Sequence, residues 1–113
     1  MPLNPVGTIT STTFGHADIY GILYTGIMQT ASGFPICNFQ PTLVDGDVTF
    51  IFPHPHQIVN GAPAGFQPHQ FHLIGNSFVD IENKKWVCVG AKCQEDSNHK
   101  LQTSSNHVQS ETT

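Results

Sequence analysis

Val48-Thr49-Phe50-Ile51-Phe52 begins the stretch of sequence with the strongest indications of the fold. Two further segments follow it, Pro53-His54-Pro55-His56 and Ile58-Val59-Asn60-Gly61. The first five residues are β-branched or aromatic and predict a strand. Proline cannot donate a hydrogen bond to a sheet ladder, so the strand is expected to end at the Pro-His repeat. Asn-Gly after two apolar residues predicts a tight hairpin turn. The centre of the chain is therefore predicted to be β-structure.

The flanking segments extend this prediction. Phe78-Val79-Asp80-Ile81 alternates apolar and polar residues, as a half-buried strand does, and Trp86-Val87-Cys88-Val89 is expected to return beside it. Residues 67–72 are expected to form a loop. Glycines and a proline interrupt residues 16–36, which leaves room for no more than a short turn or helix at 19–28. The sequence therefore predicts an all-β domain.

Composition limits the classes of function. The 113 residues suit one domain, with a folded part over 1–93 and a polar tail over 94–113 that is flexible or ordered by a partner. A net charge of −4, with four Lys and Arg together, argues against a nucleic-acid partner. No apolar run is long enough for stable membrane insertion. Met1-Pro2-Leu3-Asn4-Pro5 has no basic start or apolar stretch, so no signal peptide is expected.

Histidine is unusually abundant, with seven residues beside three cysteines. His16, His69, His72 and Cys93 lie in segments that punctuate the predicted strands and could meet at one end of a small β-domain. Three imidazoles and one thiolate would form the closed tetrahedral site that structural Zn²⁺ prefers. The alternative is that these histidines are surface residues satisfied by water or backbone.

His54 and His56 form a second candidate, a His-x-His step. In a trimer, three such steps would supply six nitrogens to an octahedral iron site. The alternative is a polar loop between prolines. Cys37 and Cys88 are expected to pack in the core. No activated nucleophile, phosphate-binding glycine loop or carboxylate pair is visible, so the protein is not expected to be an enzyme.

The order of strand and turn residues from residue 58 onward resembles that of PAAR-repeat proteins, which cap the spikes of contractile injection machines. Ile58-Val59-Asn60-Gly61-Ala62-Pro63-Ala64-Gly65 looks like one pass of the repeat, although it lacks the family's arginine. Residues 75–84 and Val89-Gly90-Ala91-Lys92-Cys93 look like a second pass. Pro5-Val6-Gly7-Thr8 and Gly15-His16 are similar to the family's opening.

The resemblance implies a small cone of short β-hairpins that caps and sharpens a trimeric β-helical spike, either VgrG-like or of a phage baseplate. The implied metal ligands are His16, His69, His72 and Cys93, with zinc as the metal and iron as the alternative. The implied location is the tip of a virion tail or of a secreted type VI-like spike, which meets the target cell envelope on penetration. Three alternatives remain open: a self-trimerising iron tip, a small secreted binding module and a cupin-type metalloenzyme.

Overall fold

The computed structural model describes residues 3–37, 39–104 and 108–112. Within these residues the chain forms β-strands and contains no helix, which confirms the predicted all-β fold. Consistently, the described chain has no helix with the length and apolarity needed to cross a bilayer.

The largest sheet is antiparallel, with strand order β12-β2-β3-β6-β9. Its strands are β12 (Lys100–Leu101), β2 (Thr12–Ala17), β3 (Leu23–Met28), β6 (Val48–His54) and β9 (Gln67–His72). Four two-stranded ribbons complete the fold: β1 (Leu3–Pro5) with β13 (Gln109–Glu111), β4 (Gly33–Cys37) with β5 (Gln40–Thr42), β7 (Gln57–Val59) with β8 (Ala62–Ala64), and β10 (Asp80–Ile81) with β11 (Lys84–Lys85).

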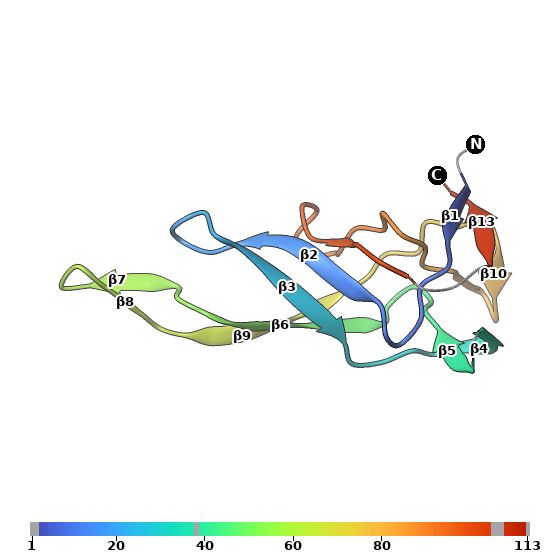
Figure 1. Cartoon of the computed structure of the whole chain (residues 1–113), viewed down its shortest axis with the longest axis horizontal. Coiled ribbons are helices and arrows are strands. Elements are labelled where there is room, and N and C mark those ends of the chain that lie inside the picture. Colours follow the sequence, from blue (N-terminus) through green and yellow to red (C-terminus); the bar gives the residue numbers. More distant parts are fainter. Residues whose placement is uncertain (1–2, 38, 105–107, 113) are drawn as a thin grey trace.

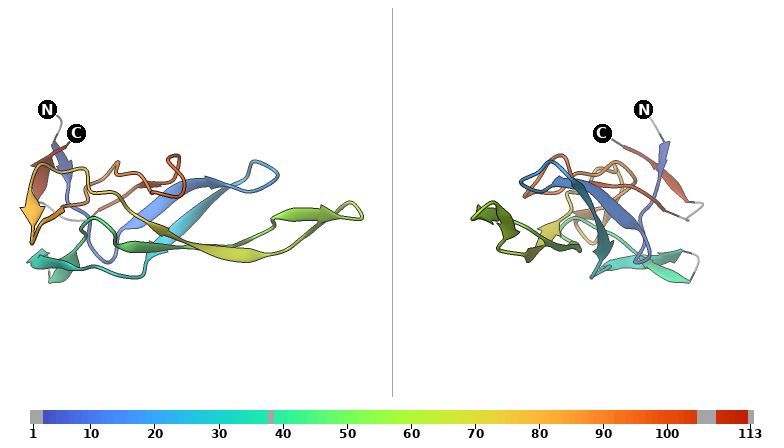
Figure 2. Two further views of the ribbon diagram at one scale, coloured as in Figure 1. Left: turned by 180° about the vertical axis from the view of Figure 1, so that it is seen from behind. Right: turned by 60° about the vertical axis from the view of Figure 1, so that its left-hand side comes forward.

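The molecule is elongated, with principal-axis extents of 50 × 27 × 23 Å. Both termini and the ribbons β1–β13, β4–β5 and β10–β11 lie at one end, which we call the base (Figure 1). The hairpin β7–β8 and the β2–β3 loop extend toward the opposite end, which we call the tip (Figure 2). The tip comprises residues 18–23 and 55–66.

The base is organised around a cyclic set of backbone hydrogen bonds. Gly7 N donates to Val87 O at 2.8 Å, Val87 N donates to Leu43 O at 2.9 Å, and Leu43 N donates to Gly7 O at 3.0 Å. Three segments far apart in the sequence thus pair with one another in a closed triangle. Isolated bridges between Val6 and Cys88, Thr8 and Thr42, and Val44 and Trp86 reinforce it. We call this arrangement the threefold ring.

The same register recurs in the neighbouring backbone bonds. The first set of three bonds joins Val89 N to Pro5 O, Ile9 N to Pro41 O and Asp45 N to Lys85 O. The second set closes three turns, with bonds from Ser11 N to Thr8 O, from Asp47 N to Val44 O and from Ala91 N to Cys88 O. The third set joins Gln29 N to Val48 O, Ile74 N to Lys92 O and Gln102 N to Thr12 O. The first and third sets link the three segments cyclically, and the second set closes an equivalent turn within each segment. The fold therefore has internal threefold pseudo-symmetry that the sequence pattern does not reveal.

The base ribbons follow this symmetry. β5 and β11 each leave a hairpin, pair with the preceding strand, and enter the threefold ring. β1 occupies the third equivalent position, and its partner is the C-terminal strand β13. The two chain ends therefore lie where the turn of a third hairpin would be.

A small core lies between the ring and the large sheet. It contains Leu43, Val87, Leu73, Leu101, Ile51 and Phe71, each at most 6% exposed. Thr13 and Thr49 are fully buried beside it, and their hydroxyls lie 2.8 Å apart, so each satisfies the other. Such a core is thin for a domain of this length, which makes further cross-links valuable.

The expected polar tail is instead part of the fold over its described residues, 94–104 and 108–112. β12 extends the large sheet beside β2, and β13 pairs with β1. Leu101 is 1% exposed and belongs to the core. The composition was misleading because pairing by backbone hydrogen bonds needs few apolar side chains, and one buried leucine supplies the packing.

Two local expectations also change. Residues 67–72, expected as a loop, form β9, because β6 offers them a pairing edge. Residues 23–28 form β3 between β2 and β6 rather than a turn or helix. By contrast, Asn60 and Gly61 form the predicted hairpin turn, with positive φ angles of 52° and 77°. Residues 44–47 also form a tight turn, in which Asp47 N donates to Val44 O at 3.0 Å.

Candidate metal centre

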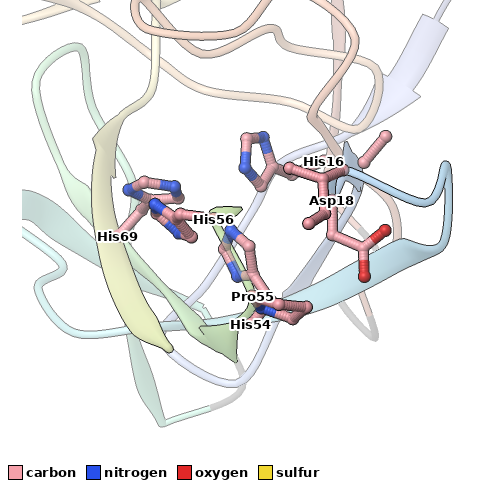
Figure 3. Close-up of a pocket in the computed structure, with 8 residues that line it drawn as sticks. His16, Asp18, His54, Pro55, His56 and His69 are labelled. Atoms are coloured by element: carbon pink, nitrogen blue, oxygen red, sulfur yellow. The ribbon is translucent and has the colours of Figure 1, made fainter. Parts of the chain in front are cut away.

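Three histidines from different strands meet beside the tip. His16 lies on β2, His54 ends β6 and His69 lies on β9. One ring nitrogen from each lies within 4.8 Å of the others. The ring centroids of His16 and His69 are 4.8 Å apart, and those of His54 and His69 are 4.7 Å apart. Figure 3 shows these imidazoles gathered with that of His56; we call the four residues the histidine cluster.

Curvature of the large sheet creates this meeting. β3 and β6 separate β2 from β9 in the strand order, yet the rings of His16 and His69 touch. Phe71 packs against both rings, with centroids 5.0 Å from His16 and 5.2 Å from His69. The sheet therefore coils so that the rings of His16 and His69 pack together against the Phe71 ring.

A bulge directs His16 into the cluster. The register between β2 and β3 shifts between Phe14 and His16, and Gly15 between them has a φ of 122°. A Cβ at Gly15 would lie 2.1 Å from the Asn98 carbonyl oxygen, so only glycine fits. A bulge of this kind re-aims the following side chain.

Asp96 fixes the orientation of the His16 ring. Nδ1 of His16 lies 2.7 Å from Oδ2 of Asp96, and a carboxylate can only accept, so Nδ1 carries the proton. Burial by itself raises the pKa of Asp96, but the hydrogen bonds from His16 and from Asn98 N outweigh it and leave the pKa below its usual value. The lone pair of the neutral His16 ring is then on Nε2.

His54 gives the strongest indication that the cluster binds an ion. It is 1% exposed, and its Nδ1 donates to the Phe52 carbonyl oxygen at 2.8 Å. The remaining lone pair is on Nε2, which is buried and has no hydrogen-bond partner among the described residues. An unsatisfied buried acceptor costs about 1–3 kcal/mol, and coordination to an ion would remove that cost.

His56 contributes a second unpaired ring nitrogen to the same cluster, as judged from the described residues. Its Nε2 is also buried and has no partner in the part of the chain that the structure describes. Its ring centroid lies 4.6 Å from that of His54 and 4.7 Å from that of His69. Burial lowers the pKa of His69, and the neighbouring imidazoles lower it further. His69 is therefore neutral near pH 7, which is the form that binds metals.

These properties fit a divalent ion. His16, His54 and His69 can hold a metal through three nitrogens, and zinc bound by imidazole has bonds of about 2.0–2.1 Å. Metal-binding histidines characteristically donate their second N–H to a carboxylate or carbonyl, as His16 and His54 do here.

The structure does not bring all four expected ligands together. His16 and His69 meet, but His72 and Cys93 lie outside the group. His72 is three residues from His69 on β9, so the two project to opposite faces, and its Nδ1 pairs with Glu95 at 2.6 Å. Cys93 is packed in the core, and burial, with the nearby Glu95 and Asp96 charges, raises the pKa of its thiol to about 12. His54, expected only in an intermolecular site, joins the cluster within one chain.

His99 was missed at the sequence level and plays a structural part. It is fully buried, accepts a hydrogen bond from His16 N at Nδ1, and donates from Nε2 to Thr13 Oγ1 at 2.6 Å. Burial, helped by the charge of His16, lowers the pKa of His99 to about 4. Because both nitrogens are used, His99 supports the backbone of His16 and is not a free ligand.

An open pocket of about 260 Å³ lies over the cluster. Its wall comes from residues 16–19 on one side and from residues 54–56 with His69 on the other. Asp18 on its rim accepts hydrogen bonds from Tyr20 N, Ile22 N and the Tyr24 hydroxyl. The pocket thus connects the histidine cluster with both loops of the tip.

Comparison with known proteins gives no relative: no protein-family model, curated protein or solved structure matches the chain.

Proposed function

We propose that this chain is a structural spike-tip protein, which caps and sharpens a trimeric β-helical spike of a contractile injection apparatus. Its apex is stabilised by one metal ion in the histidine cluster, with zinc as the favoured ion. The partner is the trimeric spike, through the base, and the tip meets the target cell envelope. The location is the end of a phage tail or of a related secreted spike.

The threefold ring is the observation that carries this proposal. Gly7, Leu43 and Val87 bond cyclically, and three two-stranded ribbons surround them at the end that holds the termini. A single chain with threefold pseudo-symmetry can meet each subunit of a trimer through a similar surface. Strands that end at a spike leave unpaired edges, which the ribbons of the base are suited to cover.

The apolar side chains of the base support the same role. Phe34 is 79% exposed and Ile36 is 68% exposed on the β4–β5 ribbon, and Leu3 is 60% exposed on β1. Exposed apolar residues on neighbouring ribbons are typical of protein–protein contact surfaces. A spike protein docked on the base would remove them from water.

Four imidazoles support a structural ion over a catalytic one. His16, His54 and His69 would occupy three positions around an ion. His56, whose buried Nε2 has no partner among the described residues, would supply the fourth. A closed four-ligand site has no position for a reactive water. The ion would tie β2, β6 and β9 together at the end of the large sheet near the tip, which is a role in stability.

The same contacts argue against the self-trimerising iron tip. That arrangement requires His54 and His56 to point outward to copies of themselves on a shared axis. Within this chain, His54 is buried and contacts His16, His56 and His69. Both histidines of the step therefore favour an ion held by one chain.

Mass and metal content measured together test the proposal. The purified chain, mixed with a trimeric β-helical spike from its source, should give a complex of one tip and three spike chains by native mass spectrometry, with one zinc. The double variant Phe34→Gln/Ile36→Gln should lose the complex and keep the metal. A complex with three tips per spike, or a complex unaffected by the base variant, would contradict the proposal.

A further inference from the structure

The tip of the molecule is apolar, protruding and nearly free of charge. Its exposed side chains are Ile19, Tyr20, Ile22 and Leu23 on the β2–β3 loop and Ile58, Val59 and Phe66 on the β7–β8 finger, each 43–59% exposed. Both loops project away from the base (Figures 1 and 2). Exposed apolar side chains that gather on two protruding loops are typical of a contact surface for another molecule.

Formal charge is nearly absent around these residues. The sequence has no Asp, Glu, Lys or Arg from residue 19 to 44 or from residue 48 to 79. The charged side chains of the base, such as Asp80, Lys84 and Glu111, have no counterpart at the tip. Asp18 is the exception, and its carboxylate is held by Tyr20 N, Ile22 N and the Tyr24 hydroxyl.

We infer that the tip is a lipid-contacting surface, which inserts the β7–β8 finger and the β2–β3 loop between the headgroups of a neutral bilayer. This inference rests on the proposed function, because it supplies the chemistry by which the tip meets an envelope. The contact is shallow and reversible and does not span the membrane.

The shape of the finger favours a bilayer over a protein groove. β7 and β8 pair throughout, with Gln57 opposite Ala64, Ile58 opposite Pro63 and Val59 opposite Ala62. Backbone groups that face each other across the hairpin are satisfied internally, whereas those on the outer edges still need water or headgroups. That combination permits entry to the headgroup level and no deeper. Tyr20, with an apolar ring and a polar hydroxyl, has the character of residues enriched at membrane interfaces.

The histidine cluster keeps this surface near neutrality when it holds an ion. Two carboxylates, Asp96 on His16 and Asp18 on the pocket rim, lie beside the cluster and balance the charge of a divalent cation. A neutral surface binds lipid by burial of apolar area, at about 25 cal/mol per Å², and not by attraction to anionic headgroups. Binding should therefore be insensitive to salt.

The test uses the full metal-loaded chain and phosphatidylcholine vesicles in a sedimentation assay. Three proteins are compared: the wild type, the tip variant Ile58→Gln/Val59→Gln and the base variant Phe34→Gln/Ile36→Gln. All changed residues are exposed, and equal metal content and melting temperature verify that the variants fold. We expect the wild type and the base variant to sediment with the vesicles equally at low and high salt. The tip variant should bind at least about tenfold more weakly, since it loses the apolar surface that both side chains would bury in the bilayer.

Absence of wild-type binding to these vesicles would overturn the inference. Binding confined to anionic vesicles and lost at high salt, or equal loss in the tip and base variants, would overturn it as well. The proposed function is tested independently, because spike docking depends on the base and is measured without lipid. A protein whose tip does not bind lipid but which still caps a spike would contradict only the lipid inference and would leave the proposed function intact.

Discussion

The rings of His16 and His69 meet edge to face, with centroids 4.8 Å apart and an interplanar angle of 89°, although two strands separate β2 from β9 in the sheet. That contact exists because the sheet coils and because the Gly15 bulge turns His16 inward. It concentrates imidazoles that repel one another when protonated and attract a cation when neutral.

Substitution of a cluster histidine should release the metal. His54→Gln removes a buried ring nitrogen that has no hydrogen-bond partner within residues 3–37, 39–104 and 108–112, so metal content should fall to near zero by elemental analysis. At a metal concentration a thousandfold above the Kd, binding stabilises the fold by about 4 kcal/mol. Loss of the ion should therefore lower the melting temperature by at least about 10 °C.

His72→Gln is the matched control, because His72 is a histidine of the same strand that pairs with Glu95 outside the cluster. It should keep one ion per chain and a melting temperature close to that of the wild type. Loss of the ion in this variant would show that the ligand set extends along β9.

The cysteines should differ in reactivity toward an alkylating reagent. Burial raises the pKa of the Cys88 thiol to about 11 and, with nearby carboxylates, that of Cys93 to about 12, and both residues are at most 1% exposed. The thiolate is the reactive form, so only Cys37 should be modified in the native protein. Mass spectrometry should find one adduct before denaturation and three after it. Rapid native labelling of Cys93 would mean that it is not a core residue.

The metal-free protein should lose stability in mild acid because of His99. Its pKa is about 4 in the folded state and about 6.5 in the unfolded state, so between these values the unfolded chain binds more protons. The free energy of unfolding should therefore fall as the pH drops from about 6.5 toward 4, by at most about 3 kcal/mol from this residue. The slope should be shallower in His99→Gln, measured by urea unfolding with a chelator present. Equal slopes in the two proteins would exclude the buried neutral state of His99.

Gly7→Ala should destabilise the threefold ring. A Cβ at this position would lie 2.7 Å from side-chain carbons of Leu101 and Leu43 and 3.2 Å from the Val87 carbonyl oxygen. Overpacking of this kind costs about 1–3 kcal/mol. Thermal unfolding should show a lower midpoint, and an unchanged midpoint would mean that the three segments do not pack as tightly as the ring requires.

The pseudo-symmetry also predicts tolerance of circular permutation. Because the chain ends occupy the place of a third hairpin turn, they can be joined by a short linker and the chain reopened between Glu82 and Asn83. The permuted protein should retain the β-type circular dichroism spectrum and one bound ion. A permuted chain that cannot fold would mean that the three ribbons are not equivalent in the base.

The sequence predicted the parts of this fold that local chemistry controls. The strand from Val48 and the Asn60-Gly61 turn follow from β-branched residues and from the turn's positive φ angles. β9 and β12 were not predictable in this way, because Gln67–His72 and Lys100–Leu101 have little intrinsic strand preference and depend on the partner strands that accept them.

The candidate site was also predictable only in part. The wealth of histidine pointed to a metal, and His16 and His69 were identified, but the choice among the remaining candidates depends on side-chain direction. Strand alternation turns His72 away from His69, and sheet curvature brings His54 toward His16. The role of Asp96 as the hydrogen-bond partner of His16 depends on the pairing of β12 with β2, which brings the loop before β12 next to His16.

X-ray absorption at the edge of the bound metal tests the central claim most directly, because it reports which atoms surround the ion. We predict a single ion per chain with nitrogen neighbours at about 2.0 Å, imidazole outer-shell features and no sulfur, with the signal lost in His54→Gln. A sulfur neighbour at about 2.3 Å, or a metal environment unchanged in His54→Gln, would contradict the assignment of the histidine cluster.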